Sequence, residues 1–149
     1  MPSRDQTEEA LNPFRPWFAA AAIYNFLWGT INILFPDLLF QLLHMPLPLY
    51  PPLWQVVGMF VLVYAPAYAW AAYRPALHSH LILIGMLGKI LGPIGFLWAA
   101  TTGQLPWSFG LAILTNDLLW WPAFSLYLSK TARIQGGWRA FLIGTCLPV

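Results

Sequence analysis

Two charged side chains, Lys89 and Asp117, fall inside long apolar stretches of the sequence. A charge at the centre of a membrane-spanning helix costs about 2.5–3.5 kcal/mol, so each of them needs a partner or a function. At a rise of about 1.5 Å per residue, Asp117 lies about 16 Å and Lys89 about 12 Å from the same end of their stretches. A short turn joins the two stretches and makes them antiparallel neighbours. The sequence therefore predicts an ion pair between Lys89 and Asp117.

Three further polar residues reach the same level. Asn25 and Tyr64 lie about 12–14 Å deep in two other apolar stretches. Asn116 precedes Asp117 and points about 100° away from it around the helix axis. These residues predict a polar layer to which all four stretches contribute. The layer can be a ligand pocket, a proton path or a quinone-type head-group site. It can equally be a closed hydrogen-bonded network that fixes helix pairing. The sequence leaves both interpretations open.

Glycines and prolines surround the same level in the third stretch. Small residues on one helix face let a second backbone approach closely, so the glycine stripe predicts a close helix–helix contact. Pro93 has no N–H, which leaves the carbonyl of Lys89 free to accept another hydrogen bond. Pro122 does the same to the carbonyl of Leu118. The stripe consists of Gly85, Gly88, Gly92 and Gly95.

The elements that carry these residues are membrane-spanning helices. The chain of 149 residues is 59% hydrophobic and only 8% charged, too few charges to cover a water-exposed globule or to form a nucleic-acid-binding face. Apolar runs of about 20 residues suffice to cross a bilayer. We therefore expect an all-α integral membrane protein, a bundle of four transmembrane helices between two tails. The helices are expected at 17–35, 53–73, 81–100 and 107–128, and the tails at 1–16 and 129–149.

The basic residues predict the orientation of the bundle. Six of the seven Lys and Arg residues fall in the amino-terminal tail, the second connection or the carboxyl-terminal tail. Four crossings place these three segments on one side, and the positive-inside rule makes that side the cytoplasm. Both termini are therefore expected in the cytoplasm.

The first connection predicts an interfacial helix over residues 37–45. Asp37, Gln41 and His44 follow helical spacing and form a narrow polar stripe, while leucine and phenylalanine fill the remaining positions. His44 can be considered as a metal or haem ligand, but the solvent-facing side of this helix is the simpler interpretation.

Other reactive side chains give weak signals. His78 and His80 in the second connection form at best half a metal site and are better explained as interfacial residues. Cys146 is a candidate for acylation in a segment, 138–149, that is too short to span the membrane and is expected on the inner leaflet or against a partner. The sequence contains no recognisable catalytic motif and no metal site, and it identifies no cofactor.

The region of residues 20–73 resembles small bacterial four-helix membrane proteins of the DoxX-like type. The likeness rests on Leu34-Phe35-Pro36 at the end of the first helix and on Gly58 in the second. Gln55 stands where an arginine opens the second helix in that group. The resemblance implies a quinone-related redox accessory role.

Together these features predict an accessory or binding subunit of a larger, for example redox, complex in the bacterial inner (plasma) membrane. The alternative is a membrane enzyme or carrier that handles a hydrophobic small molecule, a quinone or a lipid, at the polar layer. The expected partners are the lipid bilayer and either another membrane protein or further copies of the chain, but not nucleic acid.

Overall fold

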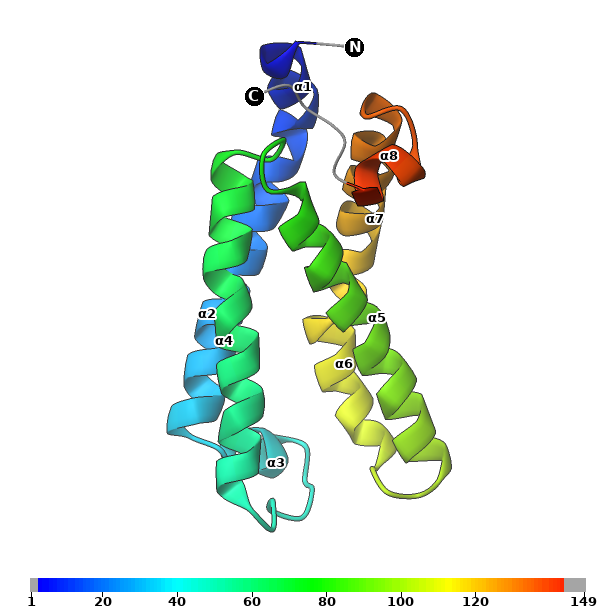
Figure 1. The fold of residues 1–149 in the computed structure, drawn as a ribbon. Helices are drawn as coiled ribbons and strands as arrows, with labels where there is room; N and C mark the ends of the chain where they lie inside the picture. The colour runs from blue at the N-terminus through cyan, green and yellow to red at the C-terminus, as the bar shows by residue number, and fades with distance from the viewer. Residues whose placement is uncertain (1–2, 144–149) are drawn as a thin grey trace.

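The chain is all-helical over residues 3–143, the part that the computed structural model describes (Figure 1). Helices follow one another with short connections, and the long ones run roughly side by side. The elements are α1 (Arg4–Leu11), η1 (Asn12–Phe14), α2 (Arg15–Leu34), α3 (Leu38–Leu42), α4 (Pro51–Tyr73), α5 (Ser79–Thr101), η2 (Trp107–Phe109), α6 (Gly110–Asn116), η3 (Leu118–Trp120), α7 (Trp121–Ile134) and α8 (Trp138–Ile143).

Within residues 3–143, three helical stretches are long and apolar enough to cross a membrane. They are Arg4–Leu34, which includes α2, then Pro51–Tyr73 and Ser79–Thr101. They contain most of the first three predicted spans. The expectation of an all-helical protein is therefore confirmed, and the length and composition of these helices support the expectation of a membrane protein. In Figure 1, α1, α8 and the α4–α5 connection lie at one end, and α3 and the α5–α6 connection lie at the other.

The predicted fourth span, 107–128, is divided into η2, α6, η3 and α7. Pro122 occupies the first turn of α7, where its missing N–H is tolerated, so a new helix begins there. Just before it, the N–H of Trp120 donates to Asp117 O at 3.2 Å, the spacing of a 3₁₀ turn. The carbonyl of Asn116 thereby loses its usual helical donor. The fourth crossing of the membrane stays a prediction.

The helix predicted over residues 37–45 is shorter in the structure. It spans Leu38–Leu42, and His44 has φ +52°, in the left-handed region. His44 N–H donates to Gln41 O at 3.1 Å, and Met45 N–H donates to Phe40 O at 2.8 Å. These two bonds end the helix as a Schellman motif. The prediction that His44 shares a helical face with Gln41 is therefore wrong.

The last described helix, α8, folds back onto the start of α5. Gly136 has φ +88° and follows the end of α7 at Ile134. Phe141 is buried and stacks on His80, with ring centroids 4.9 Å apart. Phe141 thus packs against the chain itself, whereas Trp138, Leu142 and Ile143 of α8 are exposed. Cys146 lies outside the described residues.

Helices α2 and α4 pack with direct backbone contact. A Cβ placed on Gly29 would lie 2.8 Å from Gly58 O, so neither position has room for a side chain. Trp54 Nε1 donates to Asn32 Oδ1 at 2.7 Å and Gln55 Nε2 donates to Ile33 O at 2.8 Å, which fixes the register. The close backbone contact is thus between α2 and α4, and not at the α5 glycine stripe as predicted.

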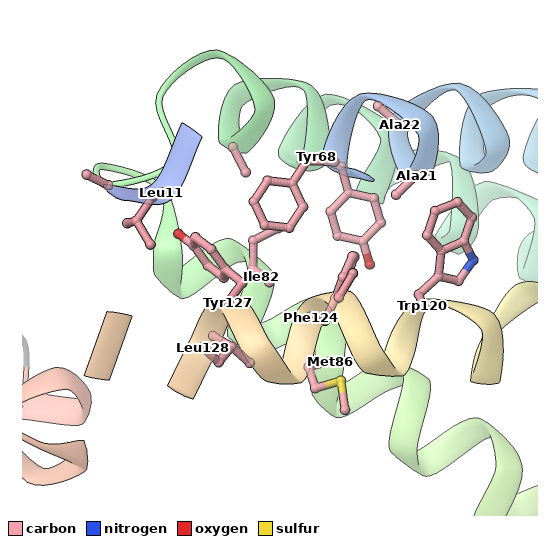
Figure 2. Close-up of a cluster of buried hydrophobic side chains, with 14 of the residues drawn as sticks. Leu11, Ala21, Ala22, Tyr68, Ile82, Met86, Trp120, Phe124, Tyr127 and Leu128 are labelled. Atoms are coloured by element: carbon pink, nitrogen blue, oxygen red, sulfur yellow. The ribbon is translucent and has the colours of Figure 1, made fainter. Parts of the chain in front are cut away.

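Aromatic side chains fill the bundle near the α1 end. Phe18 makes edge contacts with Phe124 and Tyr127, and Tyr68 contacts Phe124 from α4 (Figure 2). The Tyr127 hydroxyl donates to Pro75 O and ties α7 to the α4–α5 connection. This core closes one end of the bundle.

A second aromatic cluster lies at the opposite end. Trp54 contacts Trp28, Phe40 and Phe109, so that one indole ring joins α2, α3 and α4 to η2. Polar side chains occupy the level between the two aromatic clusters.

Cysteine labelling tests the arrangement of the ends. In a Cys146→Ser background, Gln41→Cys and Gln104→Cys should react from one side of the membrane, because both exposed residues lie at the α3 end. Arg139→Cys, at the α1 end, should react from the other side. Impermeant maleimide applied to cells and to inverted vesicles measures this. Labelling of Gln41→Cys and Arg139→Cys from the same side would contradict the topology.

Helix packing can be tested with matched alanines. Gly29→Ala should destabilise the protein by about 1–3 kcal/mol, because the new methyl group overlaps Gly58 O. Gly95→Ala, where nothing lies within 4 Å, should instead stabilise it by about 0.5–1 kcal/mol. Thermal unfolding in detergent measures both. Equal effects of the two substitutions would show that α2 and α4 are not in backbone contact.

Candidate functional site

A cavity of about 190 Å³ lies at the polar level of the bundle. Helices α2, α4, α5 and α6 and the α6–η3 junction form its walls. The structure brings all five residues of the predicted polar layer to this cavity, namely Asn25, Tyr64, Lys89, Asn116 and Asp117. The other lining residues are Val57, Phe60, Val61, Tyr68, Gly85 and Gly88.

Lys89 is held by the break between α6 and α7. Its side chain is only 4% exposed, and Nζ donates to Asn116 O at 2.5 Å. That carbonyl is free because Trp120 N–H donates to Asp117 O instead. The ammonium also lies 5.9 Å from the ring centroid of Tyr68 and 5.8 Å from that of Trp120, which adds cation–π attraction.

A second hydrogen bond runs in the opposite direction. Trp121 Nε1 donates to Lys89 O at 3.0 Å. Pro93 supplies no N–H to this carbonyl, so the expectation of a freed acceptor at Lys89 is confirmed. Each of the two interrupted helices therefore receives a side-chain donor from the other.

Asp117 reaches the cavity beside Lys89 and is 5% exposed. Its Oδ1 accepts from Asn116 Nδ2 at 3.0 Å. The two charges interact electrostatically, but within residues 3–143 no Lys89–Asp117 nitrogen–oxygen distance is as short as 4.0 Å. The predicted direct ion pair is thus replaced by an indirect link, in which Asn116 accepts from Lys89 and donates to Asp117.

The α5 glycine stripe admits side chains instead of a backbone. A Cβ on Gly92 would lie 2.7 Å from Asp117 Oδ2, and one on Gly85 would overlap the Tyr68 hydroxyl. Gly95 faces open space. Two of the four glycines therefore make room for residues of the cavity wall.

Two buried amide oxygens in the cavity wall accept no hydrogen bond from any described residue: Asn25 Oδ1 and Asn116 Oδ1. Asn25 is 2% exposed, and its Nδ2 donates to Val61 O at 3.3 Å, which uses the other end of the amide. An unsatisfied buried polar group costs about 1–3 kcal/mol. The polar layer is therefore not a closed network within the described chain.

One wall of the cavity extends to the outside of the bundle. Phe60 is 67% exposed and Val57 is also exposed, and both lie on α4. Across the cavity, Tyr64 stacks on Tyr68 with ring centroids 5.9 Å apart. The cavity thus joins a polar interior to an apolar exterior.

Sequence reasoning missed Tyr68 and Trp121. Tyr68 follows Tyr64 by one helical turn, a spacing that could have placed it on the same face. Trp121 gave no signal, because its role depends on the helix break. The histidines lie elsewhere: His80 contacts Phe141, and the ring of His78 lies 6.4 Å from that of Trp70. Residues 3–143 contain no group of three side chains suited to a metal ion.

Comparison of the chain with protein-family models, with curated proteins and with solved structures returns no match. The resemblance to DoxX-like proteins stays a prediction.

Substitutions at the two charges test the link through Asn116. Lys89→Met and Asp117→Leu should each destabilise the protein by about 3–5 kcal/mol, because each leaves the other charge buried and uncompensated. The double variant should lose less than the sum of the two. Thermal unfolding in detergent of all four proteins gives the coupling. Arg133→Met, at an exposed position, is the control and should change little. Additive losses would show that the two charges do not act as one unit.

Proposed function

We propose that the chain is a four-crossing membrane protein that binds a small amphiphilic molecule in the cavity between its helices. The unpaired, buried Asn25 Oδ1 carries this proposal. A purely structural network would be expected to satisfy such an oxygen, since buried polar groups are nearly always hydrogen-bonded. A hydrogen-bond donor on a bound molecule would remove the free-energy cost of leaving Asn25 Oδ1 buried and unpaired.

The charge pattern supports the fourth crossing and its direction. The bundle end with α1, α8 and the α4–α5 connection carries the basic tails and Arg74. By the positive-inside rule this end faces the cytoplasm, in our proposal that of a bacterial inner membrane. The break in the fourth segment is tolerable in lipid, because Lys89 satisfies the Asn116 carbonyl.

The acceptors in the cavity favour a neutral ligand with a hydroxyl donor. Asn25 Oδ1, Asn116 Oδ1 and the Asp117 carboxylate all accept, whereas Lys89 is the one positive charge among the lining residues. An anionic head group would face more acceptors than donors. The hydroxyl of a phenol or alcohol donates one hydrogen bond, for which Asn25 Oδ1 is an acceptor, and accepts one from Lys89.

The volume limits the head group to about one ring. An apolar cavity of about 150 Å³ holds benzene, so about 190 Å³ accommodates a single substituted ring. An apolar tail can leave past Phe60 and Val57 toward the lipid. Hydroquinones and simple phenols both meet this description.

A binding role is compatible with the predicted accessory subunit. Large exposed apolar side chains occur on every long helix and suit lipid as well as protein. No particular face is therefore assigned to a protein partner.

A series of matched ligands tests the proposal. 4-Butylphenol should bind the detergent-purified protein about fivefold more tightly than butylbenzene, the effect of about one hydrogen bond, and more tightly than 4-butylbenzoate. Asn25→Leu should remove the advantage of the phenol and keep the binding of butylbenzene. Gln41→Leu, at an exposed distant position, is the control. Tryptophan fluorescence titration measures the affinities.

Two results would contradict the proposal. Absence of saturable binding for all three compounds would exclude a ligand site of this size. Tightest binding of the benzoate would show that Lys89 dominates and that the ligand is an anion.

A further inference from the structure

A second, charged cavity lies at the α1 end of the bundle and is independent of the site described above. Its volume is about 540 Å³. It is formed by α1, the start of α2, and the residues where α4 passes into the α4–α5 connection. Three arginines and two carboxylates line it: Arg4, Arg15, Arg74, Asp5 and Glu8.

The arginines and carboxylates that line this cavity form no direct ion pairs with one another. Within the described chain, no arginine nitrogen lies within 4.0 Å of a carboxylate oxygen. Arg15 Nε donates to Ala72 O at 2.7 Å, and the Arg74 guanidinium lies 5.6 Å from the Tyr73 ring centroid. These contacts are to neutral groups. Positive and negative groups therefore line one cavity while their charges stay available.

The carboxylates have a defined position as well. Glu8 Oε2 accepts from Ala76 N at 3.5 Å, which joins α1 to the α4–α5 connection. Asp5 lies in the first turn of α1, one helical turn before Glu8. The acidic groups thus belong to α1, whereas two of the three arginines belong to the ends of α2 and α4.

The cavity lies at the level expected for lipid head groups. It is next to the ends of two helices that are long and apolar enough to cross a membrane. Trp17, Trp70 and Tyr73 are exposed near these ends, and exposed tryptophan and tyrosine prefer the membrane–water interface.

We infer that this cavity binds the head group of a zwitterionic phospholipid that carries a phosphate and a primary ammonium, as in phosphatidylethanolamine. Guanidinium groups recognise phosphate through paired N–H donors. The ammonium donates to Asp5 and Glu8. A choline head group has no N–H to donate, and a phosphoglycerol head group leaves the carboxylates without a cation. Of these three head groups, only ethanolamine combines the phosphate with an ammonium that has N–H donors.

The inference is tested by lipid retention on the full-length protein. Detergent-purified protein is mixed with equal amounts of phosphatidylethanolamine, phosphatidylcholine and phosphatidylglycerol, and bound lipid is measured by native mass spectrometry. The ethanolamine lipid should be retained preferentially. Arg4→Gln with Arg74→Gln should lower its retention about fivefold for each guanidinium removed. The control Arg133→Gln with Arg139→Gln removes two exposed arginines outside the cavity and should change nothing.

The acidic side of the cavity has its own test. Asp5→Asn with Glu8→Gln should remove the preference for phosphatidylethanolamine over phosphatidylglycerol, because the ammonium loses its charged acceptors. Thermal unfolding confirms that the variants stay folded. Free phosphoethanolamine distinguishes the source of the head group: displacement of the lipid only by large excess supports a lipid site.

Three results would overturn the inference. Equal retention of phosphatidylglycerol by the wild-type protein would indicate attraction of anions alone. Unchanged retention of phosphatidylethanolamine by the Arg4→Gln, Arg74→Gln variant would separate the lipid from this cavity. Saturable binding of free phosphoethanolamine without any lipid preference would make it a site for a soluble molecule.

Discussion

The hydrogen bond from Lys89 Nζ to Asn116 O is the interaction on which the centre of the molecule depends. In an apolar surrounding every backbone carbonyl needs a donor, and the 3₁₀ turn after Asn116 removes the helical one. Lys89 replaces that donor and finds at the same place the carboxylate of Asp117. The ammonium of Lys89 thus satisfies the carbonyl that the helix break leaves free, and that carbonyl in turn gives the buried charge a hydrogen-bond acceptor.

The cavity lies at the level where side chains replace missing helical hydrogen-bond donors. Pro93 interrupts the hydrogen bonding of α5, and Trp121 replaces the missing donor from the other side. Gly85 and Gly92 lack a Cβ and therefore leave space for the side chains of Tyr68 and Asp117, respectively. Aromatic clusters close the bundle above and below, so the cavity is confined to the polar level.

The sequence predicted the all-helical class and the polar residues of the cavity. Lys89 and Asp117 could be recognised from the sequence alone, because placing a charge inside a long apolar segment costs free energy that a partner or a function must offset. Depth along a helix then placed Asn25 and Tyr64 beside them. Sequence spacing did not predict how the groups connect. The link through Asn116 depends on a helix break that tertiary hydrogen bonds stabilise. The left-handed turn at His44 depends on two backbone hydrogen bonds that end the helix, and the spacing of the polar residues does not predict them. Gly29 and Gly58 lie in different helices, so no spacing pattern connects them.

The backbone contact between α2 and α4 bears on how fast the cavity between the helices can open to the exterior of the bundle. With Gly29 against Gly58, no side chain separates the two helices at this contact, so a change of rotamer cannot widen it. The wall of the cavity toward the exterior is formed instead by the side chains of Phe60 and Val57. The χ angles of these two side chains determine how wide the opening is. Exposed side chains change rotamer within picoseconds to nanoseconds, whereas hinge motions of helices take microseconds or longer. In the proposed binding role, entry of a ligand through this wall would therefore require rotation of two side chains and no movement of α2 against α4.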